Sequence, residues 1–510
     1  MLPALHKMFL SKYTRKEEKV RKFVIVLMSI GLIMAFTMPA LGADVKFSGT
    51  YIAQGYYDSN RALASDDAAT RSRAGASISD IWQRLRLQTD FQVAEGLKLT
   101  TRADIMERVW GNVARGAAPN TPYAPSATTG TIQQEAYNQE AENIRFNNVY
   151  VTANIFGGRL IAGYVAQGTW GTDFGNTGDV VFGPRLRYEY YTGPWALIAY
   201  YDWYDGTKAN PFGQSQAAGA QVEQETGSPN ASVVYTWDKG NAGLKVNYVW
   251  STVNSGTTAA AVANGIGGDR GYKTKYMQFN PYFKAQFGPV YTEGEVIYRY
   301  GKKYAYEDTA FFNTTATQGV GDVTYNGWSG YAMANVDIKP AYVGGAVVYV
   351  AGDSPATAGS PNTTDTSGPN GGSDFNPCLI LFNYDSMRWN GGLGNPAYAA
   401  TFPANSSTGA VGITNAFIIQ VFGGIKPVPK LDIKAAVAWA KADKPVTSSG
   451  WVSKDYGWEG DLTATYKIYD NLSYMVGFGY LWAGDFWKGT QAAGVVNNDY
   501  LLTHKLTLSF

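Results

Sequence analysis

Basic side chains recur at every second position along several stretches of the chain. Arg84 and Arg86 alternate with Leu85 and Leu87, and the same spacing places other bases on one face of their segments. Guanidinium and ammonium groups bind carboxylate and phosphate oxygens, so a row of them attracts anions. The bases that we predict to line a water-filled passage are Arg84, Arg86, Lys98, Arg102, Arg108, Arg185, Arg187 and Arg299.

Carboxylates share the polar positions with these bases. The acids concerned are Asp90, Asp104, Glu189, Glu293, Glu295, Glu459 and Asp461. Two interpretations stay open. The bases form a ladder that selects anions, or the polar face is an ordinary solvated wall whose opposite charges pair between neighbouring strands.

The sequence contains few of the residue types that most often carry catalysis or bind metals, histidine and cysteine. The only histidines are His6 and His504, and the only cysteine is Cys378. A catalytic triad centred on His, a Cys₄ metal site and an internal disulfide framework therefore have no residues to build them. No nucleotide-binding or nucleic-acid-binding motif stands out, so we expect no enzyme activity, no cofactor, no metal and no nucleic-acid partner.

The segments that carry the bases read as β-strands. Polar and apolar residues alternate in them, and successive residues of a strand face opposite sides. The segments are about 10–14 residues long, whereas globular strands have about 5–6 and tilted membrane-spanning strands about 9–11. Charged residues make up only 16% and aromatic residues 14%, against about 25% charged residues in soluble domains.

Short and long connections alternate along the chain. Gly157-Gly158, Gly193-Pro194 and Asp470-Asn471 are typical of tight turns, and long Gly-, Ser- and Asn-rich stretches lie between them. This pattern predicts an all-β, antiparallel, up-and-down transmembrane barrel of about 18 strands, with 16 remaining open. The expected strands are 45–57, 80–93, 97–110, 144–156, 159–170, 181–192, 195–205, 229–238, 242–254, 272–287, 290–306, 327–338, 341–353, 413–425, 431–442, 455–469, 472–486 and 499–510.

Two of the long connections have unusual composition. Residues 354–412 turn from polar to apolar at Phe375–Tyr384. An apolar patch in a polar loop usually packs on something, so this one folds into the barrel mouth, contacts a neighbouring subunit, or is mere surface decoration. Residues 111–143 end in an acidic stretch that could form a short helix facing the bases.

The N-terminal residues 1–43 read as a secretion signal. A basic stretch precedes the apolar run Phe23–Phe36, and small residues follow, so we expect cleavage after Gly42 or Ala43. The apolar run is too short for a membrane-spanning helix, which needs about 20 residues. Cleavage would leave residues 44–510 as a single barrel domain.

The C-terminus carries the resemblance to a known family. Leu502, Leu506, Leu508 and Phe510 share one face of the last segment, with His504 as a polar departure among them. An alternating strand with an aromatic final residue resembles the assembly signal of outer-membrane proteins, here Leu506, Leu508 and Phe510. With the secretion signal and the 18 segments, the whole chain resembles Gram-negative outer-membrane porins, most closely substrate-specific porins and alginate-export-type channels.

The resemblance implies a function and partners. It implies integral insertion in the bacterial outer membrane by the barrel-assembly machinery, contact with its lipid, and passive diffusion of small hydrophilic solutes, with or without a preference for anions. It leaves open a channel specific for acidic sugars or for polysaccharide export, and a structural or adhesin barrel. The chain would be a monomer or a homotrimer.

Overall fold

The computed structural model describes thirteen parts of the chain, and every statement below refers to these. They are residues 44–60, 63, 77–110, 144–178, 181–205, 223–254, 272–306, 323–352, 365–367, 369–383, 412–444, 452–488 and 496–510. The expected secretion signal in residues 1–43 and the expected acidic helix in residues 111–143 lie outside them.

Strands dominate the described residues. The two 3-10 helices among them are η2 (Asp173–Gly175) and η5 (Asp485–Lys488). No helix in these ranges is long and apolar enough to cross a membrane. The strands are β1 (Asp44–Asp58), β2 (Ile78–Ala94), β3 (Leu97–Val109), β4 (Ile144–Ile155), β5 (Gly158–Ala166), β6 (Phe182–Thr192), β7 (Trp195–Asp205), β8 (Glu223–Trp237), β9 (Gly240–Asn254), β10 (Tyr272–Phe287), β11 (Val290–Tyr306), β12 (Val323–Ile338), β13 (Ala341–Val350), β14 (Asp365–Ser367), β15 (Ala416–Val428), β16 (Leu431–Lys441), β17 (Asp455–Tyr469), β18 (Leu472–Ala483) and β19 (Asp499–Ser509).

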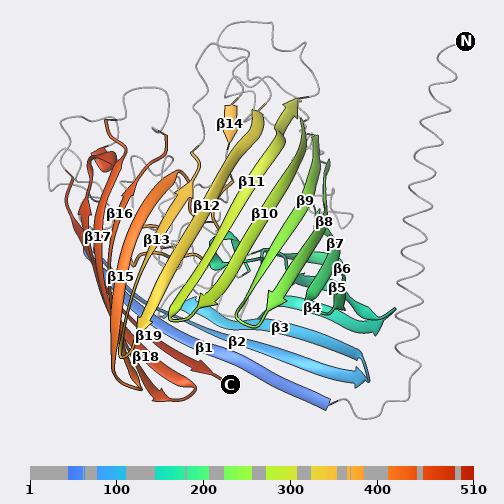
Figure 1. The fold of residues 1–510 in the computed structure, drawn as a ribbon, viewed down its shortest axis with the longest axis horizontal. Helices are drawn as coiled ribbons and strands as arrows, with labels where there is room; N and C mark the ends of the chain where they lie inside the picture. The colour runs from blue at the N-terminus through green and yellow to red at the C-terminus, as the bar shows by residue number, and fades with distance from the viewer. Residues whose placement is uncertain are drawn as a thin grey trace, which may run out of the picture.

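The strands form one closed barrel (Figure 1). All nineteen belong to a single sheet, in which β14 is a three-residue strand that lies parallel to the start of β12. The other eighteen pair antiparallel with their neighbours, and β1 closes the sheet by pairing with both β2 and β19. The predicted barrel of 18 strands is confirmed, and the 16-strand alternative is wrong.

The short turns gather at one end of the barrel, and the strand ends that border the longer connections lie at the other (Figure 1). The last strand returns to the turn end, where the Phe510 N–H donates to the Gly49 carbonyl at 3.0 Å and the Gly49 N–H to the Phe510 carbonyl at 2.8 Å. The Phe510 ring lies against Gly49, where an added Cβ would be 2.8 Å from it. The final residue therefore belongs to the seam that closes the sheet.

The outer face of the barrel is apolar and exposed. Val421, Val437 and Leu462 are each more than half exposed although they lie in the middle of their strands. Towards the long-loop end, aromatic rings pack side by side on this face: Trp439 lies 6.3 Å from Phe417 and 6.4 Å from Trp458. An apolar band bordered by aromatic rings is the outer surface of a transmembrane barrel.

His504 is on this outer face, as its position in the sequence indicates. It pairs with Gly55 of β1 and with Val476 of β18. Its imidazole covers Gly55, leaving no room there for a side chain, and lies 5.9 Å from the Tyr474 ring. The ring is therefore packed into the surface rather than projecting from it.

Candidate functional site

Ion pairs cover the inner wall of β2 to β7. Arg86 donates to both oxygens of Asp104 at 2.7 and 3.0 Å, and Arg84 lies 3.5 Å from Glu107. Both of these pairs join β2 to β3, so the charge on one strand is balanced by the next. The other pairs are Lys98 with Asp90 at 3.2 Å, Arg185 with Asp202 at 2.6 Å, Arg187 with Glu189 at 2.5 Å, and Arg159 with Glu189 at 2.5 Å.

Within several pairs the base is the partner that meets water. The Arg187 side chain is 26% exposed and the Arg159 side chain 45%, while Glu189, which binds both, is 1% exposed. Arg86 likewise shields Asp104. In contrast, Arg185 and Asp202 are equally buried. The face that a dissolved solute would meet is thus more positive than the count of charges indicates.

Arg102 and Arg299 lie over aromatic rings. The Arg102 guanidinium is 5.3 Å from the centre of the Phe182 ring. The Arg299 guanidinium is 5.4 Å from both Tyr276 and Tyr325, and its Nε donates to Gln278 at 2.6 Å. The centres of these two rings are 4.8 Å apart, so both rings lie on the same side of the Arg299 guanidinium.

Arg108 is a correction to the predicted inner wall. Met106 has a positive φ of 53°, and the pairing of β2 with β3 shifts there, so that Arg108 lies opposite Gln83. Opposed residues of an antiparallel pair share a face, and Gln83 bonds Tyr51 and Trp110 on the outside. The extra residue of this bulge turns Arg108 away from the lumen, which strict alternation could not foresee.

The connection between β5 and β6 folds into the barrel. We call residues 167–178 inner segment 1. Its centre is held on β11 by Glu295, which accepts from the N–H of Thr172 at 2.8 Å and from its hydroxyl at 2.9 Å. Trp170 donates from its indole to the Asn280 carbonyl of β10 at 2.9 Å. The segment therefore leaves β5 and β6 and crosses the lumen to the wall at β10 and β11.

The connection before β15 also folds inward. We call residues 369–383 inner segment 2. Its backbone is held by inward side chains of three strands, β12, β15 and β17. The Ser329 hydroxyl donates to the Pro369 carbonyl at 2.5 Å and the Gln420 amide to the Pro377 carbonyl at 2.5 Å. Of the three placements that the sequence left open for the apolar patch, the structure shows the one inside the barrel for Phe375–Asn383.

The carboxylates of β17 anchor the apolar part of inner segment 2. The Leu379 N–H donates to Asp461 at 3.2 Å. The next two N–H groups, of Ile380 and Leu381, donate to the two oxygens of Glu459, each at 2.6 Å. Glu459 is 1% exposed, so this acid supports the segment and does not line an open passage.

The two inner segments join inside the lumen. The Gly372 N–H donates to the Phe174 carbonyl at 2.6 Å, and the Gly178 N–H donates to the Asp374 carboxylate at 3.0 Å. The Phe174 ring, fully buried, lies 5.6 Å from Phe375 and 5.8 Å from Tyr331 of β12. Together the segments form a bridge from β5 and β6, past β12, to β17 and β18, and this bridge narrows the barrel.

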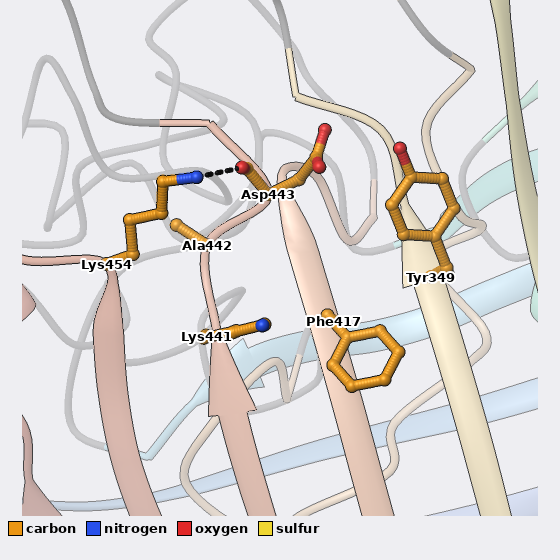
Figure 2. A pocket seen from close by; sticks show the side chains of 6 residues that line it. All are labelled: Tyr349, Phe417, Lys441, Ala442, Asp443 and Lys454. Carbon is orange, nitrogen blue, oxygen red and sulfur yellow. Dashed lines mark hydrogen bonds between the residues drawn. The ribbon is translucent and has the colours of Figure 1, made fainter.

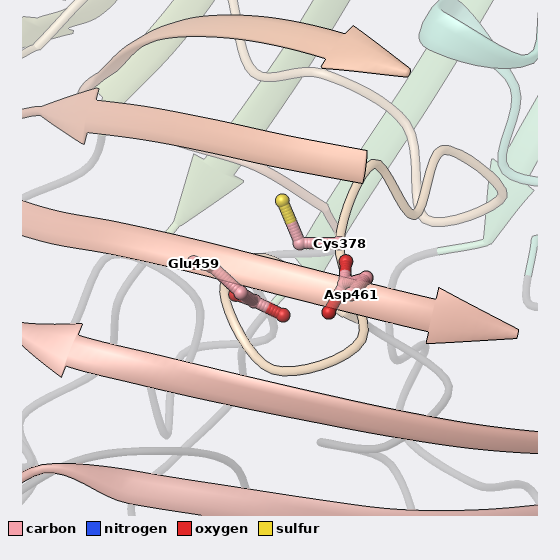
Figure 3. A group of neighbouring side chains, drawn as sticks. All are labelled: Cys378, Glu459 and Asp461. Atoms are coloured by element: carbon pink, nitrogen blue, oxygen red, sulfur yellow. The ribbon is translucent and has the colours of Figure 1, made fainter. Parts of the chain in front are cut away.

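One group of side chains near the bridge offers possible metal ligands. Ligand atoms of Cys378, Glu459 and Asp461 lie within 4.8 Å of one another (Figure 3). Both Glu459 oxygens already accept backbone N–H groups, so a cation would compete with the anchoring of inner segment 2. Burial raises the pKa of the Cys378 thiol well above its usual value, which keeps it protonated.

The pocket in Figure 2 lies on the other side of the wall. It has a volume of about 340 Å³ and is lined by Tyr349, Phe417, Lys441, Ala442, Asp443 and Lys454. Phe417 pairs with Lys441 on the outer face of β15 and β16. The pocket is therefore a feature of the outer rim and not part of the lumen.

The inward folding of inner segment 1 is not among the expectations drawn from the sequence. The signal was present, since Trp170 and Phe174 stand in a Gly-rich stretch, just as Phe375 and Phe382 do in inner segment 2. Aromatic residues in a loop that is otherwise built for water indicate a packing partner. Applied to every loop, that criterion finds both segments.

No family model and no curated protein matches the chain. Among solved structures it is similar to the outer-membrane channel DcaP of Acinetobacter baumannii, with 12% identity, coverage of 92% of this chain and 99% of that chain, and a TM-score of 0.42. It is also similar to OccAB3 of the same organism, with 8% identity, coverage of 91% of this chain and 100% of that chain, and a TM-score of 0.46. OpdK of Pseudomonas aeruginosa shows 10% identity, coverage of 91% of this chain and 99% of that chain, and a TM-score of 0.43.

Proposed function

We propose that the chain is a porin of the bacterial outer membrane that lets small hydrophilic solutes diffuse passively. A closed sheet leaves no unpaired backbone edge for the hydrocarbon to meet. Its outward side chains are apolar, and its inner wall carries ion pairs. Eighteen strands enclose more space than wall side chains can fill. Insertion by the barrel-assembly machinery and a monomeric or trimeric state belong to the same proposal.

The observation that carries the proposal is the bridge of the two inner segments. A barrel that served only as a scaffold would need no such bridge, whereas a channel needs a narrow section that limits the size of what passes. The bridge is held by hydrogen bonds to at least five strands of the polar wall.

The passage favours anions in this proposal. The support is the unequal exposure of the ion pairs, since Arg187 and Arg159 face water while Glu189 is covered. Glu295 and Glu459 are also covered, each beneath an inner segment. Positive groups at a water-filled surface raise the local concentration of anions.

Single-channel recording in a planar bilayer tests both parts. We expect stable conductance from the purified protein, and a reversal potential across a salt gradient that shows anions passing faster at low salt. Swelling of proteoliposomes in sugars of increasing size measures the size limit. A protein that inserts but does not conduct would refute the channel and favour a structural or adhesin barrel.

A further inference from the structure

Glu459 makes two of the hydrogen bonds that hold inner segment 2 to the wall. Three successive N–H groups, of Leu379, Ile380 and Leu381, point at β17, and two of them are bound by Glu459. Carboxylates accept hydrogen bonds about twice as strongly as neutral oxygens do. Because Glu459 is 1% exposed, water does not weaken these bonds.

The neighbouring strand is shaped to receive the segment. An added Cβ at Gly479 of β18 would lie 3.2 Å from Leu379 and 3.3 Å from Ile380, and one at Gly477 would lie 3.3 Å from Leu379. Any larger residue at Gly479 must push the segment, or the Asp461 carboxylate 2.9 Å away, out of place. Gly477 and Gly479, which have no side chain, thus let inner segment 2 lie close to β18.

Asp461 has a different part in this contact. Only its Oδ2 accepts from the segment, at Leu379, while its Oδ1 is buried without a hydrogen bond from a donor group. Oxygen atoms of the Asp461 and Glu459 carboxyl groups lie within 4.8 Å of each other.

We propose that Glu459 is a positioning residue that fixes inner segment 2 against β17 and β18, and that it thereby sets the largest solute that passes. It acts through the segment and touches no solute. The part concerning solutes rests on the proposed channel function, whereas the docking of the segment does not.

Cys378 makes the docking measurable in the unmodified chain. It is the only cysteine, it lies directly before the three bound N–H groups, and it is 3% exposed. A maleimide reacts with the exposed thiolate. Its rate of reaction with the folded full-length protein in detergent therefore reports how often inner segment 2 leaves the wall.

Glu459→Gln is the main variant, because glutamine has the shape of glutamate. One of the two carboxylate oxygens becomes an NH₂ group, which is a donor and therefore cannot accept from the N–H of Ile380 or Leu381. The variant loses one charged hydrogen bond, and a free-energy change of about 1.4 kcal/mol alters an equilibrium constant about tenfold. The labelling of Cys378 should therefore be at least about tenfold faster. Conductance should rise, and larger sugars should enter proteoliposomes. Glu95→Gln is the matched control, because Glu95 is exposed in the turn between β2 and β3, and its labelling and conductance should equal those of the unchanged protein.

Gly479→Val covers the case in which Glu459→Gln does not fold. It adds bulk under the segment without changing a charge, and it should give the same fast labelling and wider passage. Slow labelling in whichever variant folds would overturn the docking role of Glu459. Fast labelling with an unchanged sugar limit would overturn its role in solute size. Conductance missing from every form, the unchanged protein included, would refute the proposed channel, while the labelling would still decide the docking.

Discussion

Arg187 and Arg159 share the Glu189 carboxylate, and this gives the inner wall at β5 and β6 a net positive charge. Glu189 accepts from both guanidinium groups and also from the Tyr191 hydroxyl at 2.8 Å. One acid thus neutralises one of the two bases, and the remaining positive charge faces the lumen. The predicted pairing of opposite charges between neighbouring strands is therefore present here, and the selection of anions by the bases stays a prediction.

Arg187→Gln tests this residue-scale view. Arg159 stays to pair with Glu189, so the barrel should fold normally. A unit charge about 8 Å from a passing ion contributes about 0.5 kcal/mol in water, favourable for an anion and unfavourable for a cation. Its removal changes the difference between the two ions by about 1 kcal/mol, so the anion-to-cation permeability ratio should fall about fivefold. Reversal potentials at low salt measure it, and the difference should fade as the Debye length falls from about 30 Å at 0.01 M to about 3 Å at 1 M.

Lys239→Gln is the matched control, since this lysine lies in the exposed turn between β8 and β9. It removes the same charge outside the lumen and should leave the ratio unchanged. An Arg187→Gln channel with the ratio of the unchanged protein would show that the guanidinium is only wall lining.

At the scale of elements, the two inner segments support each other. Each is anchored on a different part of the wall, and their common contact is the cluster of Phe174, Phe375 and Tyr331. Neither segment has a regular ladder of its own, so side-chain packing and isolated hydrogen bonds hold the bridge.

Phe174→Ala should therefore loosen the bridge. Truncating a buried phenylalanine costs about 3–5 kcal/mol, because apolar contacts are lost and a cavity remains. We expect a larger single-channel conductance with more current noise, while the barrel strands stay intact by circular dichroism. Phe156→Ala is the control, because Phe156 is 90% exposed in the turn between β4 and β5. Equal conductance in the two variants would contradict the bridge as the narrow section.

The closing strand β19 gives a second prediction at this scale. Phe510 forms both main-chain bonds to Gly49, and its ring covers that glycine. Deleting Phe510 should lower the amount of protein in the outer membrane severalfold and leave the conductance of assembled channels unchanged, because the residue lies far from the bridge. Quantitative immunoblots of membrane fractions measure the amount. Phe510→Tyr should assemble normally, and a normal level of the deleted form would contradict an assembly role.

At the scale of the whole molecule, closure determines stability. Every long strand has two neighbours, so detergent finds no free edge at which to begin unfolding. We expect the folded protein to resist SDS at room temperature, to migrate differently after boiling, and to give a β-type circular dichroism spectrum. Identical migration of boiled and unboiled samples would count against a closed sheet.

The barrel could be predicted from the sequence because its signals are local. Alternation of polar and apolar residues sets the facing of a strand, and turn residues end it, so the expected strands 144–156 and 341–353, for example, appear as β4 and β13. The predicted facing of the wall bases follows from the same local rule: a slip by one residue would put charges into hydrocarbon, at about 2–4 kcal/mol each near the midplane.

Only the tertiary structure decided what the inner wall does. The bulge at Met106 that turns Arg108 outward depends on the pairing of β2 with β3. The Leu381 N–H and the Glu459 carboxylate that accepts it are 78 residues apart in the chain. No local pattern encodes such contacts, because they arise when the closed barrel brings distant polar groups together in a space that water only partly fills. The sequence alone therefore determined the barrel and its two faces, and the tertiary structure decided which loops enter it and which charges remain open to water.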